Sequence, residues 1–153
     1  MSVAEQRLLE KDIVLPEVSI PLANYVPGLI NGNMVYTSGQ LPMQKGQLKI
    51  SGKLGENLEI SDGYEAAKIC VINCLGVLKS LIGDLDRVER VVKVVGYVNS
   101  TSNFTDQPKV VNGASELLEL AFGDKGSHAR SAVGVASLPL GAACEIELIV
   151  QFK

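Results

Sequence analysis

The sequence predicts an α+β fold in which a mixed β-sheet is covered on one face by two long helices. A length of 153 residues and a hydrophobic fraction of 46% are enough for one domain with one core. Two long segments have helical periodicity, and β-rich segments precede, separate and follow them in the order β-β-β-α-β-α-β-β. Because no repeat, linker or low-complexity tract interrupts the chain, we expect residues 1–153 to form a single domain.

The first 23 residues form an N-terminal extension of this domain. Val3–Glu10 is expected to be a short helix, and the segment through Pro16 and Pro21 an extended connector, because the residue before a proline avoids the helical region. The extension is too charged at its start for a secretory signal peptide. No apolar run in the chain approaches the length of a transmembrane helix.

The β pattern begins with a hairpin. Residues 24–40 contain two β-rich runs separated by Asn31-Gly32, and an Asn-Gly pair in that setting is a strong hairpin signal. A weaker strand is expected over Gln47–Ile50, followed by a loop over Gly52–Gly55. This region therefore supplies the first strands of the sheet.

Two helices follow, with a strand between them. The first covers Ser61–Ile82, with Ser61 or Asp62 as its cap and Gly83-Asp84 after its end. Its wide apolar face is typical of a helix that lies across a sheet. Arg87–Asn99 is valine-rich and predicts a strand. The second helix begins at Thr105 or Asp106, has Pro108 in its first turn and ends near Phe122.

The last two strands, Arg130–Ser137 and Ala142–Lys153, are expected to pair as a hairpin around Leu138–Gly141. In that register Arg130 lies opposite Ile149 and shares a face with Glu145 and Glu147. Glu147 is then diagonal to Arg130, and Glu145 lies one step further. A slip of one residue would reverse the face. The small residues on this face leave room for a cavity beside the arginine; they are Ala132, Gly134 and Ala136.

Two interpretations of Arg130 follow from the residues alone. The charges can form an ion pair at the rim of the sheet. Alternatively, the planar guanidinium can bind a substrate carboxylate through two hydrogen bonds while a nearby glutamate orders or deprotonates a water. His128 is expected to form hydrogen bonds at the surface, and Cys70 and Cys74 to face the core.

Composition excludes several classes of function. The net charge is −3, and the densest basic stretch, Arg87–Lys93, is interrupted by Glu89 and valines, so nucleic-acid binding is not favoured. Three cysteines without metal or disulfide spacing indicate a reduced, cytoplasmic protein. The glycines form neither a dinucleotide fingerprint nor a phosphate-binding loop. We expect no metal and no cofactor.

The motifs resemble those of the RidA (YjgF-type) family of reactive-intermediate imine deaminases, also called the endoribonuclease L-PSP family. The C-terminal block is Arg130-Ser-Ala-Val-Gly-Val-Ala-x-Leu-Pro followed by Glu145-Ile-Glu147. Earlier blocks are Tyr25-Val-x-Gly, Gly32-Asn-Met-Val-x-Thr-Ser-Gly-Gln-Leu-Pro42 and Val111-Asn112. They occur in the family's order and cover the chain from Asn24 to its C-terminus.

The resemblance implies a chorismate-mutase-like fold and a homotrimer with a central barrel and clefts between subunits. It implies that Arg130 binds the carboxylate of a 2-imino or 2-enamino acid such as 2-aminoacrylate. Glu145 would position the water that releases a 2-keto acid and ammonia. The other positions that line the family's cleft match Tyr25, Ser38, Gly39 and Asn112.

The chain departs from the family's pattern in three places. Ala132 replaces a frequent cysteine, the N-terminus is extended, and Ser100–Val110 contains extra residues that put substrate preference in doubt. We therefore expect a cytoplasmic imine deaminase that acts on a small 2-imino acid and binds neither membranes nor nucleic acid. An endoribonuclease and a noncatalytic sensor of keto acids are the alternatives.

Overall fold

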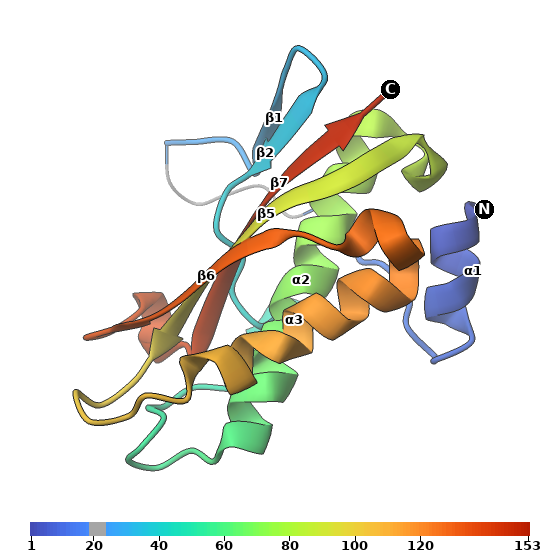
Figure 1. Cartoon of the computed structure of the whole chain (residues 1–153). Helices are drawn as coiled ribbons and strands as arrows, with labels where there is room; N and C mark the ends of the chain where they lie inside the picture. The colour runs from blue at the N-terminus through green and yellow to red at the C-terminus, as the bar shows by residue number, and fades with distance from the viewer. Residues whose placement is uncertain (19–23) are drawn as a thin grey trace.

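Figure 1 shows the computed structural model of the chain, which describes residues 1–18 and 24–153. The helices are α1 (Val3–Leu9), α2 (Ile60–Ile82) and α3 (Gln107–Phe122). The strands are β1 (Gly28–Asn31), β2 (Met34–Thr37), β3 (Met43–Gln44), β4 (Gln47–Leu48), β5 (Val88–Asn99), β6 (Ala129–Val135) and β7 (Cys144–Phe152). Short 3-10 turns cover Leu85–Arg87, Gly123–Gly126 and Pro139–Gly141.

The main sheet has the order β1-β2-β7-β5-β6 and is mixed, as predicted. β5 and β6 run parallel, and the other neighbouring strands are antiparallel. Both long helices lie against one face of this sheet (Figure 1), and the side chains between the two layers form the core. The α+β prediction is therefore confirmed, and no helix of the described residues lies on the opposite face of the sheet.

Local sequence signals account for the hairpin and for the ends of α2. Gly32 has a φ of +62°, which a hairpin turn between β1 and β2 requires. α2 begins one residue earlier than predicted, because Glu59 is its cap and its N–H donates to a carboxylate oxygen of Asp62 at 2.8 Å. Gly83, with a φ of +82°, follows the last turn of α2.

The N-terminal helix was predicted almost to the residue and packs against α3 (Figure 1). Leu8 is fully buried, and Asp86 accepts hydrogen bonds from the backbone N–H of Val3. Pro21, in the predicted connector, lies outside the described residues. The predicted strand over Gln47–Ile50 is shorter than expected and forms a separate pair with β3.

The predicted pairing of the last two strands is wrong. β5 lies between β6 and β7, so that Val94 pairs with Arg130 on one side and with Leu148 on the other. The reason lies in the connections. α3 carries the chain from β5 to β6 as a strand-helix-strand unit, which places the two strands parallel. Residues 136–143 then lead the chain to the far side of β5.

This topology separates the charges that the hairpin would have placed together. Arg130 shares a face with Val94 and Leu148, which are buried in the core on the side of the helices. Glu145 and Glu147 pair with Tyr97 and Val95 and lie on the face without helices. The prediction that Arg130 and the two acids share one face is therefore wrong.

Candidate functional site

Arg130 lies at the edge of the sheet, where α3 passes over β6. Its Nη1 donates to Oδ1 of Asn112 at 2.8 Å and to Oγ of Ser115 at 3.1 Å. Its Nη2 donates to the carbonyl oxygen of Pro108 at 3.4 Å. Among the described residues none accepts a hydrogen bond from Nε, and Nη2 has one recorded acceptor for its two protons, so each nitrogen of the Nε–Nη2 edge retains a free donor. That side-on edge has the geometry for two parallel hydrogen bonds to a carboxylate.

A serine–histidine pair lies directly behind the arginine. Oγ of Ser115 is 2.8 Å from Nε2 of His128, and Nδ1 of His128 is 2.6 Å from the carbonyl oxygen of Gly126. A carbonyl only accepts, so Nδ1 carries a proton and donates it to Gly126. His128 was expected only to form hydrogen bonds at the surface. It is instead part of the hydrogen-bond network of Arg130.

These side chains line a surface depression of about 330 Å³. The residues that line it all have polar side chains; they are Asn112, Ser115, Glu119, Ser127, His128 and Arg130. Of the small residues that were predicted to leave room beside the arginine, Gly134 is packed against the side chains of Ser100 and Gln107. The space next to the arginine lies along α3 instead.

Glu145 belongs to a second group of residues, on the other face of the sheet. A Cβ at Gly39 would overlap its carboxylate, so a larger residue there would displace the side chain of Glu145. Gln40 and Ile146 exchange backbone hydrogen bonds of 2.8 and 3.1 Å, which hold this segment against β7. Burial raises the pKa of Glu145, and the negative charge of Glu147 raises it further. Glu145 is therefore a stronger base than an exposed glutamate.

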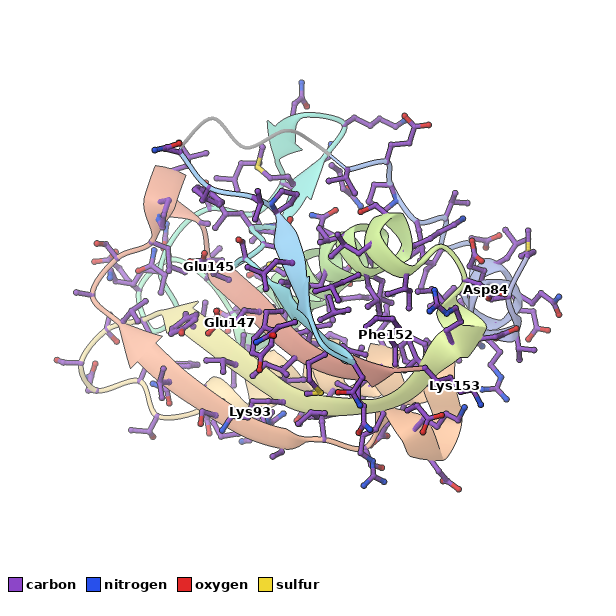
Figure 2. The ribbon with its side chains drawn as sticks, turned by 90° about the horizontal axis from the view of Figure 1, so that it is seen from above. Asp84, Lys93, Glu145, Glu147, Phe152 and Lys153 are labelled. Atoms are coloured by element: carbon purple, nitrogen blue, oxygen red, sulfur yellow. The ribbon has the colours of Figure 1, made fainter. Side chains whose placement is uncertain are left out.

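Glu147 follows Glu145 on the same face of β7, and Figure 2 labels both side chains. Its Oε1 accepts a hydrogen bond of 2.8 Å from the hydroxyl of Tyr97, and this bond raises the pKa of Tyr97. One acid is thus engaged by a neighbour in its own chain. No such partner is recorded for the carboxylate of Glu145 among residues 1–18 and 24–153.

Ser38 and Tyr25 lie near the start of β1. Oγ of Ser38 donates to the carbonyl oxygen of Val26 at 2.6 Å, which fastens the segment before β1 to the end of β2. Tyr25 precedes Val26 and is 56% exposed. Ser38 is followed directly by Gly39, the residue that lies against the carboxylate of Glu145.

One chain therefore brings the predicted residues together in two groups rather than one. Arg130 and Asn112 form the first group, and Gly39 and Glu145, with the adjacent Ser38, belong to the second. Sequence reasoning missed Ser115 and undervalued His128. The signals were present, since Ser115 follows Asn112 by one helical turn and His128 shares a strand face with Arg130.

Nothing among the described residues groups three or more histidine, cysteine or acidic side chains in a way that could hold a metal ion. Within the same residues, no helix combines the length and apolar character needed to cross a bilayer. Cys70, Cys74 and Cys144 are free and buried, as expected for Cys70 and Cys74. Burial raises the pKa of the Cys74 thiol to about 12.

Comparison with known proteins gives consistent results. A family described as YjgF/chorismate-mutase-like, putative endoribonuclease, matches residues 5–152. Protein TCP17 of Trypanosoma cruzi is 44% identical over 142 residues, which are 92% of this chain and 89% of that protein. The crystal structure of Atu1372 from Agrobacterium tumefaciens, of unknown function, is 43% identical with a TM-score of 0.93 and covers 99% of this chain and 93% of its own. A putative endoribonuclease from Shewanella oneidensis MR-1 is 34% identical with a TM-score of 0.95, over 99% and 100% of the two chains.

Proposed function

The chain belongs to the YjgF/chorismate-mutase-like family and has its α+β fold, and on that premise we propose that it hydrolyses reactive 2-imino and 2-enamino acids to 2-keto acids and ammonium. The observation that carries the proposal is the open edge of Arg130. A guanidinium whose other donors are already engaged presents one fork of fixed orientation. A small carboxylate is the ligand that matches this fork.

Arg130 has two roles in the proposed reaction. It binds the carboxylate of the substrate, and it thereby holds the neighbouring C2 atom in place. Asn112 and Ser115 keep the guanidinium from rotating, so little side-chain entropy is lost when the substrate binds. Positioning is a large part of what this reaction needs, because a protonated imine carbon is already electrophilic.

Glu145 positions and deprotonates the attacking water. The raised pKa of its carboxyl brings its basicity closer to neutral pH, which favours a general base. Water adds to C2 of the protonated imine, the C–N bond then breaks, and both protons of the water leave on nitrogen as ammonium. An enamine such as 2-aminoacrylate enters the same route after it gains a proton at C3. No metal or redox partner is needed for the balance.

The proposed active site is completed by two chains of a homotrimer. Arg130 and Glu145 lie on opposite faces of their sheet, so a cleft that contains both needs a second copy. The helix-free face also exposes large apolar side chains next to the acids, at Leu29 (48%), Tyr36 (39%) and Val133 (43%). Association of copies through that face would bury them. The three free cysteines fit a reducing compartment such as the cytoplasm.

The direct test is turnover of 2-aminoacrylate generated in situ, with pyruvate as the measured product. We expect the wild-type protein to accelerate pyruvate release and Arg130→Ala to lose the acceleration. Arg90→Ala is the matched control, because it removes a guanidinium from an exposed position of β5. A wild-type rate no higher than that of Arg130→Ala would reject the proposal. Binding of a 2-keto acid without turnover would identify a sensor instead.

RNA cleavage is the second candidate, because the similar protein from Shewanella oneidensis is called a putative endoribonuclease. His128 and Arg130 both contact Oγ of Ser115, which places an imidazole, a group that can serve as acid or base in phosphodiester cleavage, beside a cation. The net charge of −3 and the acids on the helix-free face are unfavourable for binding RNA. Cleavage of a single-stranded RNA that persists through purification and is lost in His128→Gln would favour this function.

A further inference from the structure

The polar depression beside Arg130 extends along α3 beyond the arginine. Asn112, Ser115 and Glu119 follow one another at spacings of three and four residues, so they share one face of the helix. Arg130 contacts the first two, and Glu119 lies one turn further along. At 1.5 Å per residue, this turn corresponds to about 6 Å. The depression therefore has a guanidinium near one end and a carboxylate at the other.

Neither charge is neutralised within the described part of the chain. No ion pair within 4.0 Å is recorded there for Arg130 or for Glu119, although three other pairs are present. Glu119 is exposed on the helix, and its Cα lies close to Gly126, the residue whose carbonyl accepts from His128. Glu119 and His128 are thus neighbours at the same end of the depression.

His128 lies at this end with both ring nitrogens engaged within the chain. Its Nδ1 donates to the carbonyl oxygen of Gly126, and its Nε2 is 2.8 Å from Oγ of Ser115. A ligand with a second carboxylate would face the negative charge of Glu119. All six lining residues have polar side chains, which favours a polar group over an apolar one. A positively charged group is the one that this end of the depression complements.

We propose that the depression selects 2-imino acids whose side chain ends in a cation, with the substrate carboxylate on Arg130 and the cation on Glu119. This inference rests on the proposed function and names the substrate class of the same site. The helical turn from Ser115 to Glu119 is about 6 Å long, and the extended side chain of a basic amino acid is long enough to follow it toward Glu119. The imines formed from basic amino acids have such side chains. Glu119 acts as a specificity-determining residue, and Ser127 and His128 contribute hydrogen-bonding groups.

The imines of arginine and citrulline provide the test, because the two side chains have the same length and differ in charge. Each imine is generated in situ by an L-amino-acid oxidase, and its removal is followed by competition with semicarbazide. We expect kcat/KM to be about tenfold higher for the arginine-derived imine, the effect of one charge-assisted hydrogen bond in a partly desolvated site. Glu119→Gln should remove this preference.

Glu116→Gln is the matched control, since it removes the same charge from the same helix but contacts Tyr64 outside the depression. Its preference should equal that of the wild type. Glu119→Lys should reverse the selectivity and improve turnover of the glutamate-derived imine. Equal kcat/KM values for the two imines in the wild type, or a preference that survives Glu119→Gln, would overturn the inference.

The results that would overturn the inference about Glu119 can be distinguished from results that would reject the proposed function. If 2-aminoacrylate is hydrolysed in an Arg130-dependent manner but charge selectivity is absent, only the inference about Glu119 is wrong. If no imine is hydrolysed, calorimetric binding of the keto acids that correspond to arginine and citrulline decides the matter. Tighter binding of the cationic keto acid, lost in Glu119→Gln, would support the binding site. Equal or undetectable binding of both would reject it.

Discussion

The Arg130 and Glu145 regions differ in how far a single chain completes them. The guanidinium of Arg130 is held by Asn112, Ser115 and Pro108, all from α3. Glu145 is half-buried beside a second acid, and within the described residues neither a cation nor a hydrogen-bond donor is recorded for its carboxylate. Folding of one chain therefore gives the guanidinium of Arg130 its hydrogen-bond partners, whereas the carboxyl group of Glu145 keeps a raised pKa.

The two regions would therefore contribute to the proposed reaction in different ways, one through binding and the other through basicity. A preorganised arginine lowers the entropic cost of binding a carboxylate. An acid held in an unfavourable environment is a better base, and contacts from a second chain or a substrate can offset the cost. If the two regions face each other across a subunit interface, the binding half and the reactive half of one cleft come from different copies.

Disruption of the helix-free face should have the largest effect. Val133 lies on β6 opposite Tyr97 and is 43% exposed, so Val133→Asp places a charge where copies would pack. Val14→Asp, at a position 74% exposed in the N-terminal connector, is the control. We expect Val133→Asp to sediment as a monomer and to lose imine hydrolysis, while Val14→Asp does neither. A fully active monomer would show that one chain suffices for imine hydrolysis, and the Arg130 and Glu145 regions would then not need to come from different copies.

The two glutamates should differ strongly in their effect on kcat. Glu145→Gln keeps the size of the side chain but removes the base, so kcat for 2-aminoacrylate should fall by about 10²- to 10³-fold. Glu147→Gln should lower kcat less than about tenfold, because Glu147 is engaged by Tyr97 and acts on Glu145 through its charge. The measurement is pyruvate release at saturating substrate. A larger loss in Glu147→Gln would assign the base to the other acid.

Arg130→Lys should have a smaller effect and one of a different kind. Lysine keeps the positive charge but lacks the planar fork, so KM should rise by about tenfold while kcat changes less. Initial rates over a range of substrate concentrations separate the two constants. If kcat falls and KM is unchanged, the arginine takes part in the chemical step, and the division between a binding region and a reactive region is incorrect.

Local signals predicted most of the fold. Asn31-Gly32 located the hairpin, and Gly83 located the end of α2. The pairing of β6 and β7 with β5 rather than with each other was missed, because their closeness in sequence favoured a hairpin. The alternation of β5, α3 and β6 is itself typical of a parallel pair, and it predicts the observed neighbour of β6. Partner choice depends on long-range packing that no local motif contains.

The candidate site was predictable in its residues but not in its arrangement. The motifs identified Arg130, Asn112, Gly39 and Glu145, and the structure joins them as two pairs on opposite faces of the sheet. The face of a side chain follows from strand register, so the wrong partner for β6 reversed the position of Arg130. Ser115 was missed because a serine inside a helix is an ordinary surface residue unless its neighbours across the turn are known.

The acidic limb of the pH profile offers the smallest and most specific effect. Glu145 works as a carboxylate, so kcat should fall as the pH decreases through its raised pKa. Glu147→Gln removes the charge that contributes to this elevation, which lowers the pKa of Glu145 and should move the acidic limb to lower pH. Tyr97→Phe removes the hydrogen bond to Glu147 but leaves the charge of Glu147 in place. The acidic limb of the Tyr97→Phe profile should therefore stay close to that of the wild type. If both variants move the limb equally, the hydrogen bond rather than the charge governs Glu145. If neither does, burial alone raises the pKa, and the reactive region owes its basicity to its position on β7.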